Sequence, residues 1–298
     1  MVKLPKLSIV TPSFNQYQFL EATIQSVLSQ DYPNLEYIII DGGSTDGSLE
    51  IIRKYEDHLH FWCSEPDQGQ YDAINKGFAH STGEIMAWLN SDDMYYPWAF
   101  NTVVSIMSEL PQVEWLTTLN RGTLDWHGFP IKFYPIAGYS REAFLDGYYL
   151  PVGSKTGIAA IQQESTFWRR SLWQKIGSCI RTEFRLAGDF DLWARFYQYA
   201  DLYGTHSPLA GFRYQANQKS RQLDKYIIEA EKSLAQMRDS SHWSLNLMRS
   251  MVRKLNLYRI PKLRKWIEPM YTYTSQIIIR SNPESPTSFW MIEESRFF

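Results

Sequence analysis

The chain has 298 residues, of which 44% are hydrophobic and 15% aromatic, so it can bury one large core. Its formal net charge of -2 excludes the strongly basic class of general nucleic-acid binders. The two cysteines, Cys63 and Cys179, exclude a disulfide-rich scaffold and fit a reducing compartment. Since the sequence shows no signal-peptide pattern and no run of about 18 apolar residues, we expect a cytoplasmic protein without a membrane span.

The N-terminal part of the chain, at 6–110, alternates between strand-like and helix-like patterns. Short runs rich in apolar and β-branched residues occur at 6–14, 35–43, 60–66 and 84–90. Apolar residues recur at helical spacing at 18–30, 44–56, 69–83 and 98–110. Strands that are apolar on both faces and separated by helices predict a mostly parallel sheet flanked by helices, in a doubly wound, Rossmann-like α/β fold.

The second half of the chain is less regular. Residues 128–157 are rich in Gly, Pro and Tyr and predict a loop with short elements. Residues 162–177 indicate a strand that leads into a short helix, and residues 185–200 indicate a turn followed by a helix. A possible edge strand follows at 209–215, and the pattern beyond 220 is helical.

The C-terminal part differs from the rest in charge. Residues 249–280 carry eight Lys or Arg and a single Glu, although the whole chain is slightly acidic. We therefore divide the chain into a domain at 1–220 and a helical, basic extension at 221–298. Within the extension, 248–271 mixes cations with Leu, Tyr, Ile and Trp. This pattern predicts an amphipathic helix that lies on an anionic membrane surface, or a helix packed on the domain with its basic face in solvent.

Polar residues gather where the predicted strands end. They are Thr11 and Asn15, Asp41 to Gly43, Glu65 and Asp67, and Asp92 and Asp93. In a doubly wound sheet, ligands bind at the C-terminal ends of the strands. Four such ends along one edge therefore predict a ligand site.

The adjacent carboxylates Asp92 and Asp93 follow a buried apolar run at 85–89. Like charges side by side raise each other's pKa unless a positive group lies beside them. Mg²⁺ or Mn²⁺ is a candidate for that group, because both ions prefer oxygen ligands and would offset the charge of a diphosphate. Alternatively, Ser91 to Asp93 cap the helix expected near Tyr96.

Two more acidic segments have two interpretations each. In IIIDGGSTDGS, at 38–48, the glycines could cradle a phosphate or Asp41 could accept hydrogen bonds from a base or ribose, but a tight strand-to-helix turn explains the pattern as well. In GDFDLW, at 188–193, Asp189 or Asp191 could be a general base, while the other anchors the turn or complements the helix dipole.

Three segments share their order and spacing with a known family. They are LSIVTPSFNQYQFLEATIQSVLSQDYPNLEYIIIDGGSTDGS, SEPDQGQYDAINKGFAHSTGEIMAWLNSDD and AGDFDLWAR. Together they resemble family 2 glycosyltransferases over roughly residues 5–215, and most of all the bacterial members that build O-antigen and other surface polysaccharides. The resemblance implies the GT-A fold and a nucleotide-diphosphate sugar as donor, with UDP as the nucleotide. It also implies Mg²⁺ or Mn²⁺ as cofactor, a glycan or glycolipid as acceptor, and inversion at the anomeric carbon.

The resemblance also implies roles for individual residues. Those implied to bind the nucleotide-sugar are Thr11, Pro12, Asn15, Asp41, Asp72, Asn75, Lys76 and Asp92. Asp93 is implied to bind the metal. The residues implied on the acceptor side are Gln163, Glu164 and Trp193.

The implied mechanism is a single displacement in which an aspartate removes the proton of the acceptor hydroxyl. Asp189 takes the position of this base, but Gly188 replaces the acidic residue often found before it, so Asp191 remains an alternative. A nucleotidyltransferase is a second possible function, although TPSFNQYQF lacks the Gly-rich loop with Arg and Lys that it requires. A non-catalytic nucleotide-sugar-binding protein is a third.

Overall fold

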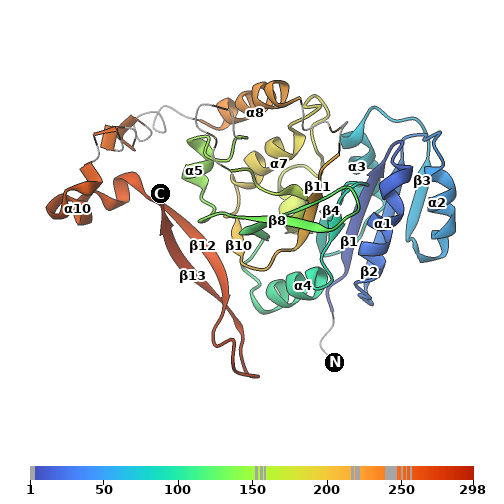
Figure 1. Ribbon diagram of the computed structural model, residues 1–298, viewed down its shortest axis with the longest axis horizontal. Coiled ribbons are helices and arrows are strands. Elements are labelled where there is room, and N and C mark those ends of the chain that lie inside the picture. Colours follow the sequence, from blue (N-terminus) through green and yellow to red (C-terminus); the bar gives the residue numbers. More distant parts are fainter. Residues whose placement is uncertain are drawn as a thin grey trace.

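The protein is described by a computed structural model over residues 4–151, 154, 157, 159–215, 218, 222–238, 247–249, 251–252, 254–255 and 257–298. Its main element is a nine-stranded sheet flanked by helices (Figure 1). From one edge to the other, the strands are β13 (Trp290–Phe297), β12 (Tyr273–Arg280), β10 (Tyr203–Thr205), β6 (Trp115–Thr118), β9 (Phe167–Arg169), β4 (Ile85–Trp88), β1 (Leu7–Ser13), β2 (Leu35–Asp41) and β3 (Phe61–Ser64).

The alternation of strands and helices predicted for the N-terminal part of the chain is confirmed. β1 pairs in parallel with β2 and with β4, and β2 pairs in parallel with β3. The helices that alternate with these strands are α1 (Tyr17–Leu28), α2 (Ser48–Lys54), α3 (Gln70–Ala79) and α4 (Ala99–Glu109). β9 runs antiparallel between β4 and β6, so the sheet is mostly parallel, as expected, with an antiparallel strand near its middle.

The elements expected at 162–177 and 185–200 are also present. β9 leads directly into α6 (Arg170–Lys175), and α7 (Gly188–Phe196) follows after a turn. The region at 128–157 contains β8 (Pro130–Pro135) and the short helix α5 (Arg141–Leu145), and part of this region lies outside the described residues.

A second sheet of four strands lies against this frame. Its order is β5 (Met94–Tyr95), β11 (Ala210–Arg213), β7 (Asn120–Leu124) and β8. The prediction of an edge strand at 209–215 is wrong, because β11 lies between β5 and β7. This internal position brings the end of β11 to the turn that follows β4, where the backbone N–H of Arg213 donates to Asp93.

Among the described residues of the C-terminal part, helices occur only before residue 272. α8 (Leu223–Met237) and α10 (Pro261–Tyr271) agree with the expected helices. The prediction is wrong for the residues after 272, because β12 and β13 form an antiparallel hairpin and β12 pairs in parallel with β10. In Figure 1 this hairpin is a long ribbon on the side of the molecule away from β3. The chain thus returns to the main sheet after residue 272.

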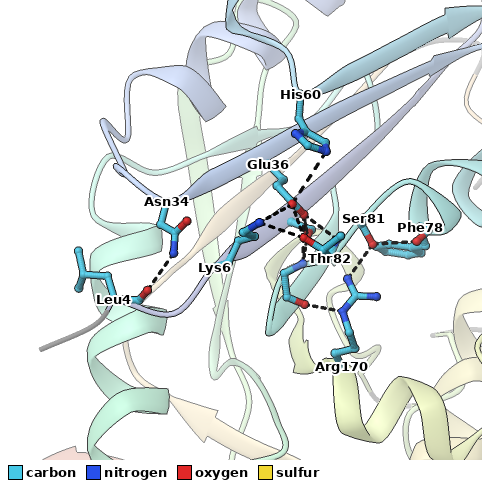
Figure 2. Close-up of polar contacts among 11 residues, drawn as sticks. Leu4, Lys6, Asn34, Glu36, His60, Phe78, Ser81, Thr82 and Arg170 are labelled. Carbon is cyan, nitrogen blue, oxygen red and sulfur yellow. Dashed lines mark hydrogen bonds and ion pairs between the residues drawn. The ribbon is translucent and has the colours of Figure 1, made fainter.

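A buried carboxylate joins the N-terminal ends of the central strands, at the edge away from the polar strand ends (Figure 2). Glu36 accepts hydrogen bonds from the Ser8 hydroxyl at 2.6 Å, the Thr82 N–H at 2.7 Å and the Gly83 N–H at 3.1 Å. The Lys6 ammonium pairs with it at 3.0 Å. Burial alone would raise the pKa of Glu36, but these hydrogen bonds outweigh burial and lower the pKa to about 2.

None of the helices within the described residues is long and apolar enough to cross a bilayer.

Candidate functional site

The acidic pair occupies the turn between β4 and β5. Asp93 is only 1% exposed, and its carboxylate accepts the Arg213 N–H at 2.9 Å and the Asn90 side-chain amide at 3.2 Å. Asp92 is partly exposed, and it accepts a hydrogen bond from the Gln215 side-chain amide. Burial raises the pKa of both carboxylates, and the charges of Asp92 and Glu164 raise the pKa of Asp93 further.

Arg213, at the end of β11, is the cation nearest to this pair, and the sequence reasoning missed it. Its Nε donates to the Asp92 carbonyl oxygen at 2.6 Å and its Nη1 to the Trp126 carbonyl oxygen at 2.8 Å. The guanidinium therefore binds main-chain oxygens, and no ion pair to either carboxylate forms among the described residues. Its sequence signal is a lone cation in the apolar run LAGFR.

The pair offers few carboxylate oxygens to a hard divalent cation, and those of Asp92 are the accessible ones. No group of three or more His, Cys, Asp or Glu side chains within the described residues is arranged to hold a metal. Asp92 offers a partly exposed carboxylate that has no ion-pair partner among the residues the structure describes, whereas both oxygens of Asp93, the expected ligand, already accept hydrogen bonds in the interior. One or two carboxylates suffice for Mg²⁺ or Mn²⁺ when substrate phosphates and waters complete the coordination.

The two candidate bases on α7 have different surroundings. Asp191 is buried and pairs with Arg195 at 3.0 Å and Arg181 at 3.4 Å, and it also accepts the Ser233 hydroxyl at 3.0 Å. Asp189 is partly exposed, has no ion pair within the described part of the chain, and accepts the Tyr226 hydroxyl at 3.1 Å. Burial raises the pKa of Asp189 to about 6, against the opposing effect of its hydrogen bonds. Asp189 therefore combines a partly exposed carboxylate with a pKa in the range of a general base, whereas the carboxylate of Asp191 is enclosed by its ion pairs.

Gly188 begins α7 because the backbone passes close to α3 at this point. A Cβ at this position would lie 2.7 Å from the ring of Tyr71. The Tyr71 hydroxyl also bridges the helix start, since it donates to the Leu186 carbonyl at 2.8 Å and accepts the Asp189 N–H at 3.4 Å. The tyrosine thus occupies the space in which a larger residue before Asp189 would lie.

The residues expected to bind the nucleotide at the ends of β1 and β2 mostly make hydrogen bonds within the protein. Thr11 is fully buried and shares a hydrogen bond with the Tyr37 hydroxyl at 3.1 Å. Asp41 is fully buried and accepts the Ser44 N–H at 2.8 Å and the Ser64 hydroxyl at 2.7 Å. These contacts agree with the turn interpretation of 38–48.

Pro12 is also buried, and Asn15 ties the two loops together. Asn15 adopts a left-handed φ of 51°, its side-chain oxygen accepts the Thr45 N–H at 2.9 Å, and its own N–H donates to Ser44 at 2.8 Å. The loops that follow β1 and β2 are therefore held as one unit.

Two other residues reach the surface at these strand ends. Phe14 is 60% exposed, and a Cβ on Gly42 would lie 3.3 Å from its ring and 2.8 Å from the carboxylate of Asp67. Phe14, Gly42 and Asp67 therefore adjoin one another. An aromatic face and a carboxylate that follow strands are visible in the sequence, but their proximity depends on the pairing of β1, β2 and β3.

The residues predicted on α3 divide into two kinds. Lys76 is partly exposed and pairs with Glu65 at 3.0 Å and Asp72 at 3.4 Å. Asn75 instead exchanges two hydrogen bonds of 2.8 Å with the backbone of Ile180, so it anchors the segment before α7. Lys76 and Asp72 thus lie at the end of β3, and Asn75 has a structural contact.

The residues expected on the acceptor side are enclosed. Gln163 donates to the Trp88 carbonyl at 2.8 Å and accepts the Asn90 amide at 3.1 Å, so it supports the acidic turn. Glu164 is buried, and burial together with the charges of Asp92 and Asp189 raises its pKa to about 7. The structure thus gathers Asp92, Asp93, Glu164 and Asp189 into one acidic cluster between β4 and α7.

The assignment of Trp193 to the acceptor side is wrong. Its indole is 1% exposed and stacks on Trp88, with ring centroids 5.9 Å apart, and on Trp115 at 5.6 Å. The side chain thus packs α7 onto the sheet and has no surface for a sugar.

The chain matches one family model. The model for glycosyl transferase family 2 matches residues 8–174, which include the acidic turn and end before α7.

Several bacterial proteins are similar in sequence. An uncharacterised glycosyltransferase of Rickettsia typhi is 28% identical over 228 residues, which cover 74% of this chain and 69% of the relative. A Mycobacterium tuberculosis glycosyltransferase is 41% identical over 96 residues, 32% of this chain and 37% of the relative. Bacillus subtilis TuaG, whose name assigns it to teichuronic acid biosynthesis, is 38% identical over 94 residues, 30% of this chain and 37% of its own.

Solved structures share the fold at low sequence identity. Staphylococcus aureus TarS residues 1–349, in complex with UDP-GlcNAc, has a TM-score of 0.58 and 14% identity, over 89% of this chain and 78% of TarS. The mannosyltransferase PcManGT of Pyrobaculum calidifontis, in complex with GDP-Man and Mn²⁺, has a TM-score of 0.51 and 14% identity, over 90% of this chain and 85% of its own.

Proposed function

This chain belongs to glycosyl transferase family 2, and from that premise we propose that it transfers a sugar from a UDP-linked donor to a hydroxyl of a glycan or lipid-linked acceptor, with inversion. It is an enzyme with the mostly parallel α/β architecture of the GT-A glycosyltransferases that resemble it. The TarS complex supports a UDP-sugar, and the likeness to TuaG supports a role in surface-polysaccharide synthesis.

The donor would lie along the C-terminal ends of β1 to β4. Phe14 offers an aromatic face for the base, and Asp67 offers a hydrogen-bond acceptor beside it. Asn15 and Asp41 hold the loops that form this end of the site. Lys76, which pairs with Glu65 and Asp72 in this structure, would supply a positive charge to the phosphates after leaving these partners.

A divalent cation fits at Asp92, with the buried carboxyl group of Asp93 behind it. The PcManGT complex with Mn²⁺ supports this choice of ion. Such an ion supplies Lewis-acid stabilisation of the negative charge that grows on the diphosphate.

The chain's own residues supply the base chemistry at α7. The acceptor hydroxyl has a pKa far above neutrality, so it needs a base in place as it attacks the anomeric carbon. Asp189, with a pKa of about 6, is mostly ionised at neutral pH and can take this proton. Attack on the face opposite the leaving diphosphate forms the new glycosidic bond as the old bond to phosphate breaks, which inverts the carbon.

The contrast between Asp189 and Asp191 carries this proposal, and the pair provides its test. Asp189→Asn removes the base but keeps the shape, so we expect UDP release from the donor to fall by a factor of about 100 to 10,000. The donor is first chosen by thermal shift with Mn²⁺ from UDP-GlcNAc, UDP-glucose, UDP-galactose and GDP-mannose. Turnover is then measured with and without a glycan acceptor.

Asp191→Asn is the matched comparison. It breaks buried ion pairs to Arg195 and Arg181, so we expect it to lower the melting temperature. Near-normal turnover by Asp189→Asn, together with inactivity of a folded Asp191→Asn protein, would reverse the assignment. Donor binding without any turnover by the wild type would support the non-catalytic alternative instead.

We also propose that the segment 248–271 contacts a membrane surface, where a lipid-linked acceptor would lie. α10 exposes Trp266, which is 83% exposed, and Leu263, with Lys262 on the same short helix. Apolar side chains among cations at the surface are the chemistry that anionic lipid attracts.

A further inference from the structure

α8 packs against α7, although it begins well after the segment that matches the family model (Figure 1). Three of its residues, Tyr226, Glu229 and Ser233, contact the first turn of α7 or the residues just before it. Their spacing of three and four residues places them on one face of α8. One face of α8 is thus aligned with the helix that carries the proposed base.

The central contact is made by Tyr226. Its hydroxyl donates to Oδ1 of Asp189 at 3.1 Å. Burial, and then the charge of Asp189, raises the pKa of Tyr226 well above its usual value, so the phenol stays protonated and remains a donor. Only the carboxylate of Asp189 can be the acceptor in this pair.

Contacts from α8 on either side of Asp189 hold the start of α7 in place. The Glu229 carboxylate accepts the Leu186 N–H at 2.8 Å and the Ala187 N–H at 2.9 Å, two donors at the start of α7. The Ser233 hydroxyl donates to Asp191 at 3.0 Å, one turn further on along α8. These three bonds hold the backbone and the neighbouring side chain, and none of them reaches the side chain of Asp189.

We propose that Tyr226 is a positioning residue for Asp189. The Tyr226 hydroxyl orients the Asp189 carboxylate and favours its ionised form. This inference rests on the proposed role of Asp189 as the base. It assigns to α8, far along the chain from the family motifs, a part in the reaction that no resemblance indicated.

The electrostatic surroundings of Asp189 come from three elements. α3 contributes Tyr71, the short turn at Gln163–Ser165 just before β9 contributes the carboxylate of Glu164, and α8 contributes Tyr226 and the carboxylate of Glu229. Burial favours the protonated acid, whereas hydrogen bonds from the Phe190 N–H, the Tyr226 hydroxyl, the Asp189 N–H and Tyr71 favour the ionised form. Removal of the Tyr226 hydroxyl should therefore raise the pKa of Asp189.

The test is a ¹³C NMR titration of protein labelled at the aspartate side-chain carboxyl. The Asp189 signal is identified by its absence from Asp189→Asn. In Tyr226→Phe we expect its midpoint to move upward by about one pH unit, because a hydrogen bond to a charged group stabilises it by roughly the equivalent of tenfold in proton affinity. At pH values below the new midpoint, we expect the rate of UDP release by Tyr226→Phe to be about tenfold lower than that of the wild type. Above the midpoint the two rates should approach each other. The KM for the donor should be unchanged.

Ser233→Ala is the matched control. It removes a hydroxyl on the same face of α8 that does not touch Asp189, so the Asp189 midpoint should stay in place even if the melting temperature falls. An unchanged midpoint in a folded Tyr226→Phe protein would overturn the positioning role. If Asp189→Asn kept full turnover, the proposed base would fail instead, whatever the midpoints show.

Discussion

Neighbouring side chains decide the difference between Asp189 and Asp191, which lie two residues apart in one helix. Asp191 is neutralised by Arg195 and Arg181, and Asp189 faces a phenol. The sequence indicates that one of the two is a base, but the choice depends on partners that lie up to 42 residues away. The same holds for the acidic turn, where burial distinguishes Asp93 from Asp92.

The buried carboxylate at the other end of the sheet gives a prediction for stability. The pKa of Glu36 is lowered from its usual value of 4.5 to about 2 in the folded protein. Ionised Glu36 therefore stabilises the folded protein by roughly 3 kcal/mol. This contribution is fully present above about pH 4.5 and is lost as the pH falls toward 2. We expect Glu36→Gln to lower the unfolding free energy at neutral pH and to flatten its decline over this acid range.

Urea unfolding as a function of pH measures this effect. Glu21→Gln is the matched control, because Glu21 pairs with Lys54 at the surface and should contribute at most about 1 kcal/mol. Equal acid sensitivity in Glu36→Gln and the wild type would show that another group causes the loss.

At the level of elements, local pattern predicts the strands β1 to β4 and the helices α1 to α4, because their periodicity is strong. It misses β12 and β13, which become part of the sheet because β12 pairs with β10, a strand from much earlier in the chain, and β13 pairs with β12. In the second sheet it predicts only the strand at 209–215, and it misses the others, since the strands of this sheet are two to six residues long and come from distant segments. Short strands with long-range partners leave little periodic signal.

The apolar surface of α10 gives a prediction at this scale. Full-length protein should pellet with vesicles that contain phosphatidylglycerol and much less with pure phosphatidylcholine vesicles. The double variant Lys262→Glu with Trp266→Ser should reduce this partition about tenfold, because it removes a cation and an exposed indole.

Phe129→Ser is the control for this experiment, since Phe129 is 69% exposed on the loop before β8, outside the segment. Binding of the double variant equal to that of the wild type would support the alternative in which the helix only packs on the protein.

At the scale of the whole molecule, the two ends of the central strands carry different polar groups. The N-terminal ends meet at the Glu36 network and stabilise the sheet, while the C-terminal ends carry the acidic cluster. The sequence predicts the polar C-terminal ends, since strand ends are readable along the chain, but it does not predict the Glu36 network. It does not predict Arg213 and Tyr226, because residues that complete the site from later elements are identified only once the sheet and α8 are assembled.

The central claim is that the turn after β4 binds a diphosphate through a divalent cation. It is tested most directly by calorimetric titration of UDP into the protein with Mn²⁺ and with the metal chelated, for the wild type, Asp92→Ala and the distant surface variant Asp57→Ala. We predict that Mn²⁺ tightens UDP binding at least tenfold, about 1.4 kcal/mol, in the wild type and in Asp57→Ala, and not in Asp92→Ala. Equal UDP affinity with and without Mn²⁺ in the wild type, or an undiminished Mn²⁺ effect in Asp92→Ala, would contradict the account.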